Sequence, residues 1–279
     1  MYIRMVNCLA IGDMGKGTND QLKVAKAIKK LYKKNKIRFV LGLGDNIYPD
    51  GCSSVNDKLF NDNFETMYRG LPNDRWYMCL GNHDYGYQQT SRGLLDNSRN
   101  QVEYTNHSKK WFMPSKYYSF TKGPVEFFYL DTNLDRMSES VIQHQLKIMK
   151  RKLDTSKKKF KVVVGHHTWR SVAGHGNAEP RFETFLKDLF QDTKPHLYMC
   201  GHDHCKSLII KDGITLVVSG NGGEAYHDDH INMDMMHDSQ LDYFSPSLGF
   251  SILHILPNSI DVSFYNVDGF REYKHRITS

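Results

Sequence analysis

Five short segments of the chain place glycine next to side chains that bind metals or move protons. They read GDMG from Gly12, GDNIY from Gly44, GNHD from Gly81, GHH from Gly165 and GHDH from Gly201. Each follows an apolar run that is typical of a buried strand. Glycine permits a tight turn and a close approach of the backbone at such a point. Because sites in open α/β sheets form beyond the carboxyl ends of strands, we expect the five segments to meet at one site.

The side chains in these segments are of the types that bind transition metals in proteins. They include Asp13, Asp45, Tyr48, Asn82, His83, His166, His167, His202 and His204. A single aspartate after a strand is usually a helix cap, and a single histidine is often a core residue. Five such segments in succession favour a metal centre. The alternative stays open for Tyr48, because this ring can also close the core beside the turn at Pro49.

The apolar pattern predicts alternating strands and helices over the first two-thirds of the chain. Strands are expected at 5–11, 37–43, 75–80, 125–130, 161–165 and 196–201, and helices at 20–34, 58–68, 138–153 and 181–190. The last third reads as strands and turns, which predicts antiparallel pairing. Residues 86–116 show no clear period and are expected to form long surface loops. No repeat or linker interrupts the pattern, so we expect one domain over residues 1–279.

The composition is that of a folded chain with a packed core. Of the 279 residues, 39% are hydrophobic and 12% are aromatic. The formal net charge of +6 favours anionic substrates. We interpret the lysine runs at 29–34 and 157–159 as solvated helix faces; a nucleic-acid surface is the alternative, but no basic motif of that kind supports it. We therefore expect no nucleic-acid partner. No apolar run reaches the length of a membrane span, so we expect no membrane association either.

The amino terminus and the cysteines bear on where the protein acts. The first apolar residues lead directly into Gly12 and Asp13 without a cleavage-site pattern, and we interpret them as the first strand. The five cysteines are odd in number and show no paired spacing, which is typical of a reducing compartment. We therefore expect an intracellular, cytosolic protein. We also expect it to be a monomer. A secreted or lysosomal protein is the alternative if the sequence has been trimmed.

Taken together, the five segments resemble the motifs of the purple acid phosphatases, within the calcineurin-like metallophosphoesterase superfamily. The family patterns GDxG, GDxxY, GNH(D/E), VxxH and GHxH match residues 12–15, 44–48, 81–84, 163–166 and 201–204. The animal-type tartrate-resistant acid phosphatases are the most similar group, and the resemblance covers nearly the whole chain. It implies an α/β fold, a four-layer α/β/β/α sandwich with two mixed sheets. Gly15 and Tyr48 are the discriminating positions, because general metallophosphoesterases carry a histidine at the first and lack the tyrosine.

The resemblance also implies a dinuclear centre of Fe(III) and a divalent ion, which is Fe(II), Zn or Mn. The implied ferric ligands are Asp13, Asp45, Tyr48 and His204. Asp45 would bridge to the divalent ion, whose other ligands would be Asn82, His166 and His202. Anionic oxygens suit Fe(III), whereas imidazoles and an amide suit a divalent ion. Because a free phenol titrates near pH ~10, only a strongly Lewis-acidic ion would keep Tyr48 ionised near neutral pH.

The implied activity is that of an acid phosphatase, which hydrolyses phosphomonoesters with a hydroxide that the two metals activate. The substrate would be a small molecule or a phosphoprotein. The leaving alcohol needs a proton. His83, beside Asn82, is the first candidate donor, and His175 is the second by resemblance. In the animal-type enzymes a glutamate precedes the matching histidine, whereas this chain has Gly174. Their long repressive loop is also missing after residues 130–132, so we expect activity without proteolysis.

Two other functions stay open. One is a divalent-metal phosphodiesterase, nucleotidase or phosphoprotein phosphatase of the same superfamily, which Gly15 and Tyr48 argue against. The other is a scaffold without catalysis, which would have lost ligands, whereas all seven positions are filled here. We interpret the stretch 226–238, rich in His and Asp, as a rim loop that bears on substrate selection; a further metal site is the alternative. His167 receives no role.

Overall fold

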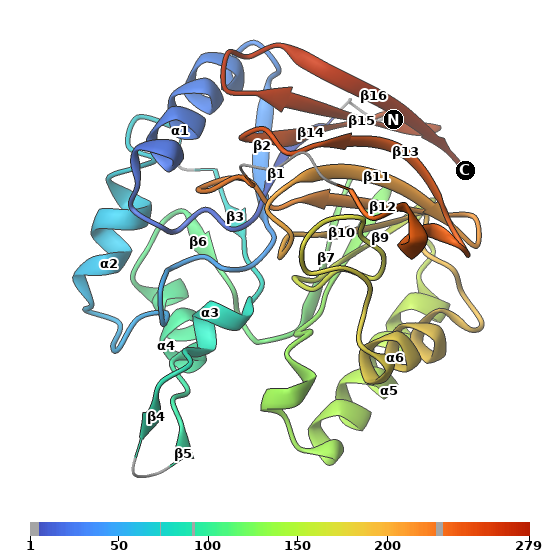
Figure 1. The fold of residues 1–279 in the computed structure, drawn as a ribbon, viewed down its shortest axis with the longest axis horizontal. Coiled ribbons are helices and arrows are strands. Elements are labelled where there is room, and N and C mark those ends of the chain that lie inside the picture. Colours follow the sequence, from blue (N-terminus) through green and yellow to red (C-terminus); the bar gives the residue numbers. More distant parts are fainter. Residues whose placement is uncertain (1–5, 73, 91–92, 227–230) are drawn as a thin grey trace.

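Two seven-stranded sheets form the centre of the molecule (Figure 1). This computed structural model describes residues 6–72, 74–90, 93–226 and 231–279. Across the first sheet lie β16 (Arg271–Thr278), β15 (Ser259–Asn266), β14 (Gly249–Ile255), β1 (Val6–Ile11), β2 (Ile37–Gly42), β3 (Trp76–Tyr77) and β6 (Trp111–Phe112). Across the second lie β13 (Gln240–Ser245), β11 (Lys206–Lys211), β12 (Ile214–Ser219), β10 (Leu197–Cys200), β9 (Phe160–Val164), β8 (Val125–Tyr129) and β7 (Tyr118–Lys122).

Both sheets mix parallel and antiparallel pairs. In the first, β1, β2, β3 and β6 run parallel, and β14 joins the edge of β1 antiparallel. In the second, β8, β9, β10 and β12 run parallel, while β7, β11 and β13 are antiparallel to their neighbours. Parallel neighbours bring their carboxyl ends to the same edge of a sheet, and the five glycine-containing segments follow the parallel strands β1, β2, β3, β9 and β10.

Helices cover the outer faces of the sheets. They are α1 (Asn19–Tyr32), α2 (Lys58–Phe60) with a π-helical turn at Asn61–Glu65, α3 (Asn82–Tyr85), α4 (Ser98–Glu103) with a 3-10 turn at Tyr104–Asn106, α5 (Glu139–Thr155) and α6 (Pro180–Phe190). Short 3-10 turns also occur at Leu134–Arg136 and Met233–Met236, and a small hairpin pairs β4 (Gln89–Thr90) with β5 (Gly93–Leu94). In Figure 1, α1 and α2 lie on one side of the sheets and α5 and α6 on the other.

The alternation of side chains along the second sheet divides the core into layers. Phe127, Val162 and Met199 belong to the cluster shared with the first sheet and α1. Their chain neighbours Phe128 and Val163 belong to the cluster under α5 and α6. Since successive residues of a strand point to opposite faces, the second sheet is buried on both sides. The expected α/β/β/α sandwich with two mixed sheets is thereby confirmed; the expectation of a single domain stays a prediction.

Several element boundaries differ from the sequence-based expectation. The first helix begins at Asn19, and its cap is Thr18, whose hydroxyl accepts from the backbone of Gln21 at 3.3 Å. The expectation of plain surface loops over 86–116 is wrong, because this region contains α4 and β6. Trp111 is buried there against Phe60 and Phe64, with ring centroids 5.5 and 5.1 Å apart. Such packing between distant segments leaves no local period. The strands β7 and β13 were also missed.

The structure bears on two further expectations. No helix in the described part of the chain is long and apolar enough to cross a bilayer. Residues 130–138 connect β8 to α5 through only a short 3-10 turn. This agrees with the expectation that the long repressive loop of the animal-type enzymes is missing from this chain. Four residues of the stretch 226–238 lie outside the described residues.

Candidate metal centre and active site

The five segments meet at one place, which spans both sheets. Asp13 follows β1, Asp45 and Tyr48 follow β2, and Asn82 begins α3 just beyond β3; these strands belong to the first sheet. His166 follows β9, and His202 and His204 follow β10, in the second sheet. A backbone hydrogen bond joins the two sheets here, since Gly12 donates to Ser219 at 2.8 Å; within the second sheet, Gly201 donates to His166 at 3.1 Å. The site therefore lies beyond the carboxyl ends of strands, as the sequence predicted.

Three of the candidate ligands have left-handed backbone conformations. The φ angles are 55° at Asp13, 50° at Asp45 and 70° at His202. Left-handed conformations are uncommon for residues other than glycine and cluster at functional sites, because the surrounding structure must hold them. Here they turn the chain sharply at the end of each strand and direct the side chain into the site.

Three other candidate ligands converge on the Tyr48 hydroxyl. This hydroxyl donates to Asp45 Oδ2 at 2.9 Å, lies 3.2 Å from Asp13 Oδ1, and lies 3.4 Å from His204 Nε2. His204 Nε2 is also 3.6 Å from Asp13 Oδ1. The ring of Tyr48 is buried, with 8% of its surface exposed. Two roles were considered for Tyr48, closing the core or acting as a ligand. In the structure its ring is buried and its oxygen is directed toward the candidate ligands.

The other ligand group converges on His166. Its Nε2 lies 2.9 Å from Asn82 Oδ1, 3.3 Å from His202 Nδ1 and 3.5 Å from Asp45 Oδ1. Asp45 thus directs one oxygen toward Tyr48 and the other toward His166. Asp45 therefore lies between the two groups of candidate ligands. The buried oxygens and nitrogen of Asp13, Asp45 and His166 lie within 4.8 Å of one another.

The donors fit a cation between them. His166 Nδ1 lies 2.9 Å from the carbonyl oxygen of Leu43, which can only accept, so Nδ1 carries the hydrogen. The lone pair of Nε2 then faces the oxygens of Asn82 and Asp45. Atoms with lone pairs approach this closely in a buried site only around a proton or a metal ion. His204 has the same orientation, since its Nδ1 lies 3.1 Å from Glu224 Oε2 and leaves Nε2 toward Asp13.

The ionisation of the site points the same way. Burial raises the pKa of Asp13. Burial, together with Asp13 and Asp45, raises the pKa of the Tyr48 phenol well above its ordinary value. Burial opposes the charge of His166, but Asp45 outweighs it and raises the His166 pKa to about 9. Two carboxylates and a phenol crowded in a buried site are stabilised by positive charge, which a proton on His166 or a bound metal ion supplies.

The two candidate proton donors lie on different sides of this cluster. The backbone N–H of His83 donates to Asp45 Oδ1 at 2.9 Å, and its ring packs on Tyr48 with centroids 4.2 Å apart. His83 Nδ1 is 2.6 Å from the carbonyl oxygen of Pro49, while Nε2 is 3.9 Å from Asp45 Oδ2. His175 is exposed, and its ring stacks on His202 at 4.0 Å. Both are next to the cluster, and their catalytic roles stay predictions.

Gly15 and Tyr48 depend on each other sterically. The backbone N–H of Tyr48 donates to the carbonyl of Gly15 at 3.0 Å. A Cβ at Gly15 would lie 1.8 Å from the carbonyl oxygen of Asn46, a clash that only a backbone shift could relieve. The GDNIY turn therefore lies against the GDMG turn only because position 15 has no side chain. The glycine at position 15 and the tyrosine at position 48, which discriminate the family in sequence, are therefore parts of the same packed pair of turns.

Sequence reasoning missed several side chains that hold the site in place. Asp84 is fully buried and accepts hydrogen bonds from the backbone of Gly81, Asn46 and Ile47 at 2.8 to 3.1 Å and from Gln101 at 2.6 Å. It joins the second and third segments. Lys16 forms an ion pair with Glu224 and lies 4.8 Å above the Tyr48 ring. The signal for Glu224 was present, because GNGGE follows β12 as the other segments follow their strands.

Asp203, between the two ligand histidines, was also missed. It is fully buried, and its Oδ1 accepts from the backbone N–H of His175 at 2.7 Å and from the hydroxyl of Tyr226 at 2.8 Å. Tyr226 stacks near His204, with centroids 5.7 Å apart. A Cβ on Gly174 would lie 3.1 Å from the Tyr226 hydroxyl, so Tyr226 occupies the space beside that glycine. Asp203 thus connects the His175 loop, which lies between β9 and α6, with the start of the rim loop at Tyr226.

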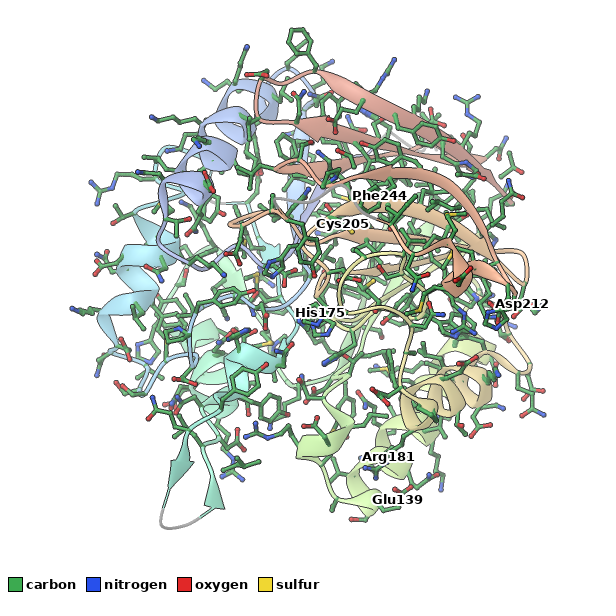
Figure 2. The ribbon with its side chains drawn as sticks, in the orientation of Figure 1. Glu139, His175, Arg181, Cys205, Asp212 and Phe244 are labelled. Atoms are coloured by element: carbon green, nitrogen blue, oxygen red, sulfur yellow. The ribbon has the colours of Figure 1, made fainter. Side chains whose placement is uncertain are left out.

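A cavity of about 500 Å³ adjoins the cluster on the side of Asn82 and His202. His175 and His167 line it, and it extends to Phe182 at the start of α6. His167, which received no role from the sequence, is held by Thr132, whose hydroxyl lies 2.7 Å from Nδ1. Figure 2 labels His175 in the central part of the molecule and Arg181 nearer α5.

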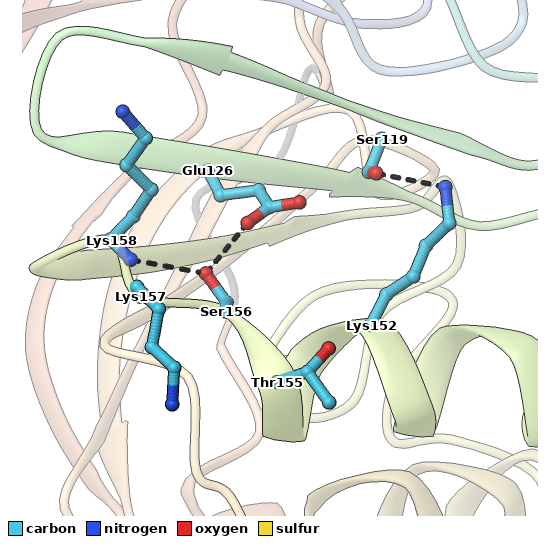
Figure 3. A pocket seen from close by; sticks show the side chains of 7 residues that line it. All are labelled: Ser119, Glu126, Lys152, Thr155, Ser156, Lys157 and Lys158. Atoms are coloured by element: carbon cyan, nitrogen blue, oxygen red, sulfur yellow. Dashed lines mark hydrogen bonds between the residues drawn. The ribbon is translucent and has the colours of Figure 1, made fainter.

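A second cavity of about 420 Å³ lies elsewhere (Figure 3). Lys152, Lys157 and Lys158 line it, but Glu126 lies among them and accepts from Ser156 at 2.6 Å. It adjoins the segment that enters β9, at the end of that strand opposite to His166. None of the predicted site residues lines this cavity. The carboxylate of Glu126 among the lysines would repel an anionic substrate there.

Comparisons with known proteins show what this chain is related to. Residues 6–206 match the family model of calcineurin-like phosphoesterases. The chain is 30% identical to purple acid phosphatase 7 of Arabidopsis thaliana over 94% of its own length and 82% of the relative's. It is 29% identical to the rabbit (Oryctolagus cuniculus) tartrate-resistant acid phosphatase type 5 over 96% and 90% of the two chains.

Among solved structures, the Plasmodium protein GAP50, described as the anchor in the inner membrane complex, aligns with a TM-score of 0.83 and 22% identity over 98% of this chain and 89% of that one. That likeness shows the fold alone. The sequence matches and the buried Asp/His cluster show more: this chain belongs to the calcineurin-like phosphoesterase family and is homologous to the purple and tartrate-resistant acid phosphatases.

Proposed function

We propose that this protein is a phosphomonoesterase of the purple acid phosphatase type, with one ferric and one divalent ion. The observation that supports it most is the Tyr48 hydroxyl, which lies within 3.4 Å of atoms from Asp13, Asp45 and His204. A phenol in this position adds an anionic oxygen to one side of the centre. Hard, trivalent iron favours such ligands over the imidazoles on the other side.

A dinuclear metal site is typical of the family, and the residues of this chain divide into two ligand sets around Asp45. The set for the ferric ion is Asp13, Asp45, Tyr48 and His204. The set for the divalent ion, which we propose to be Fe(II), Zn or Mn, is Asp45, Asn82, His166 and His202. When bound, the ions would polarise the phosphoryl oxygens and lower the pKa of water.

The remaining work belongs to side chains of the protein. Asp84 and Asp203 hold the ligand segments and the His175 loop in place through buried hydrogen bonds. The phosphate of the substrate would lie near Asn82 and His202, where the 500 Å³ cavity opens. His175 lines that cavity, whereas His83 does not, so His175 is the better placed of the two to protonate a leaving alcohol there.

Metal analysis and visible spectroscopy of the isolated protein test this proposal. We expect about one iron and one further metal per chain, and a phenolate-to-iron absorption band in the visible range. Tyr48→Phe should abolish the band while leaving the ring in the core. Hydrolysis of an aryl phosphate completes the test. Two divalent ions without a band would favour the divalent-metal phosphodiesterase, nucleotidase or phosphoprotein phosphatase instead.

A non-catalytic role is the second candidate, and the fold likeness to GAP50 is the observation that favours it. In that case the purified protein would hold no stoichiometric metal and hydrolyse no phosphate ester. The full set of seven ligand side chains argues for catalysis, because a scaffold has no need to keep buried carboxylates close together.

A further inference from the structure

The cavity beside the proposed centre has two chemically different ends. The inner end is formed by Asn82, His202 and His175, which offer hydrogen-bond donors and proposed metal ligands. The outer end is formed by Asp135, Glu179 and Arg181. A phosphomonoester with its phosphate at the inner end would therefore place its organic group toward the outer end.

The wall between the two ends consists of rings and an aliphatic side chain. The ring centroids of His202 and His167 are 4.6 Å apart, and the ring centroid of Phe182 is 6.1 Å from that of His167. Phe182 and Leu134 are buried beside this row, with 6% and 4% of their surfaces exposed. Tyr87 also lines the cavity and is half exposed, at 51%. Such a surface favours a flat, apolar group.

The charge at the outer end is negative. The Arg181 guanidinium donates to Glu139 at 2.7 Å and to the carbonyl oxygen of Leu134 at 3.3 Å, so its charge is already paired (Figure 2). Asp135 and Glu179 are exposed, and neither forms an ion pair with any residue that the structure describes. The amino-terminal end of α6 contributes only about half a positive charge, less than either carboxylate. An anionic group at this end would be repelled.

We propose that this cavity is a leaving-group subsite that selects phosphomonoesters by the charge of their organic group. It takes an apolar ring that is neutral or positively charged at its far end. It disfavours carboxylated leaving groups and polyphosphates, although the chain as a whole is positive. Asp135 and Glu179 are the specificity-determining residues. The inference rests on the proposed phosphomonoesterase function and extends it to a substrate class.

Two phenyl phosphates that differ only in the charge of a side arm test the proposal. Tyramine phosphate carries an ammonium group, and the phosphate of 3-(4-hydroxyphenyl)propionate carries a carboxylate, on nearly the same leaving phenol. With the metal-loaded protein at pH 6 and low salt, we expect kcat/KM to favour the ammonium ester by about 3- to 30-fold, a range typical of two exposed charge interactions.

The double variant Asp135→Asn with Glu179→Gln should bring this ratio close to one, and should raise kcat/KM for pyrophosphate relative to phenyl phosphate. Asp154→Asn, which removes an exposed carboxylate at the far end of α5, should leave the ratio unchanged. A ratio near one in the unmodified protein, or an unchanged ratio in the double variant, overturns the inference while leaving the phosphatase proposal intact. Failure to hydrolyse phenyl phosphate at all overturns the proposed function and this inference with it.

Discussion

Gly15 and Tyr48 illustrate how single residues define the chemistry of this site. The tyrosine supplies an oxygen among the carboxylates, and the glycine lets the two turns lie together. A histidine at position 15, as in general metallophosphoesterases, would need the GDNIY turn to move away. The tyrosine of this chain would then lose its place.

Gly15→Ala tests this dependence. The new methyl group would overlap the Asn46 carbonyl, and overpacking of this kind typically costs about 1–3 kcal/mol. We expect a lower melting temperature, less bound iron and a weakened visible band. Gly123→Asn is the control, because the nearest atom to a Cβ there is 3.7 Å away and asparagine tolerates its positive φ. Retention of iron and band in Gly15→Ala would show that the turn tolerates a side chain.

The proton donor is also a question at the residue scale. His175→Ala should lower kcat by about 10²- to 10⁴-fold for an alkyl phosphate, since an alkoxide is a poor leaving group. The loss should be much smaller for 4-nitrophenyl phosphate, which needs little protonation. His83→Ala should show a weaker dependence on the leaving group. Equal losses for both esters in His175→Ala, with metal content unchanged, would remove His175 from this role.

At the scale of elements, the loops are positioned by side chains that lie between the ligands. Asp203 separates His202 from His204 and receives hydrogen bonds from the His175 loop and from Tyr226. The His175 ring stacks on His202, and the Tyr226 ring lies near His204. Movement of either loop would therefore alter the surroundings of both ligand histidines.

Tyr226→Phe isolates this connection, because it removes one hydroxyl and leaves the ring. We expect kcat for an alkyl phosphate to fall by up to about tenfold, since one hydrogen bond to a carboxylate is lost. The loss should again be smaller for 4-nitrophenyl phosphate if the hydroxyl acts by positioning His175. Tyr243→Phe is matched to it, as that hydroxyl donates to Glu272 at 2.9 Å outside the candidate site. Similar losses in both variants would indicate a general effect on stability.

The pairing of β15 with β16 predicts a pH dependence of stability. Asp261 on β15 accepts from Arg276 at 2.6 Å and lies 2.7 Å from Lys274, and these partners lower its pKa to about 2. The unfolded value is near ~3.9, so the stabilisation is fully present above pH ~4 and is lost as the pH falls toward 2.

Asp261→Asn should therefore lower the melting temperature by about 1–3 °C at pH 7. The difference from the unmodified protein should shrink as the pH falls from 4 to 2. Calorimetric scans across that range test the expectation. A difference that stays constant from pH 7 to pH 2 would show that the carboxylate charge is not the cause.

For the molecule as a whole, the proposed centre joins the two sheets. Asp13, Asp45 and Asn82 extend from the first, and His166, His202 and His204 from the second. Ions bound there would act as cross-links and would also offset the repulsion between buried carboxylates. Metal binding at the proposed centre would therefore be coupled to the stability of the fold.

Removal of the metals should lower the melting temperature substantially. At a free-metal concentration a hundredfold above Kd, binding contributes about 2.7 kcal/mol, which chelation would abolish. Scanning calorimetry before and after chelation, followed by reloading with iron and zinc, measures the effect. Asp45→Asn, which lacks the proposed bridging carboxylate, should show a smaller response to the chelator. An unchanged melting temperature after verified metal removal would exclude this coupling.

The sequence alone determined the order of elements around the site, because this order depends on local patterns, and the resemblance of its motifs to a known family indicated the candidate ligands. An apolar run followed by glycine and a polar residue is readable within about ten residues, and it recurs at five strands. The tertiary structure decided which other residues serve the site. Lys16 and Glu224 are 208 positions apart, and the aromatic packing of Trp111 with Phe60 brings order to a region without a period. Contacts of this kind exist only once segments far apart in the sequence have packed together, and no local pattern encodes them.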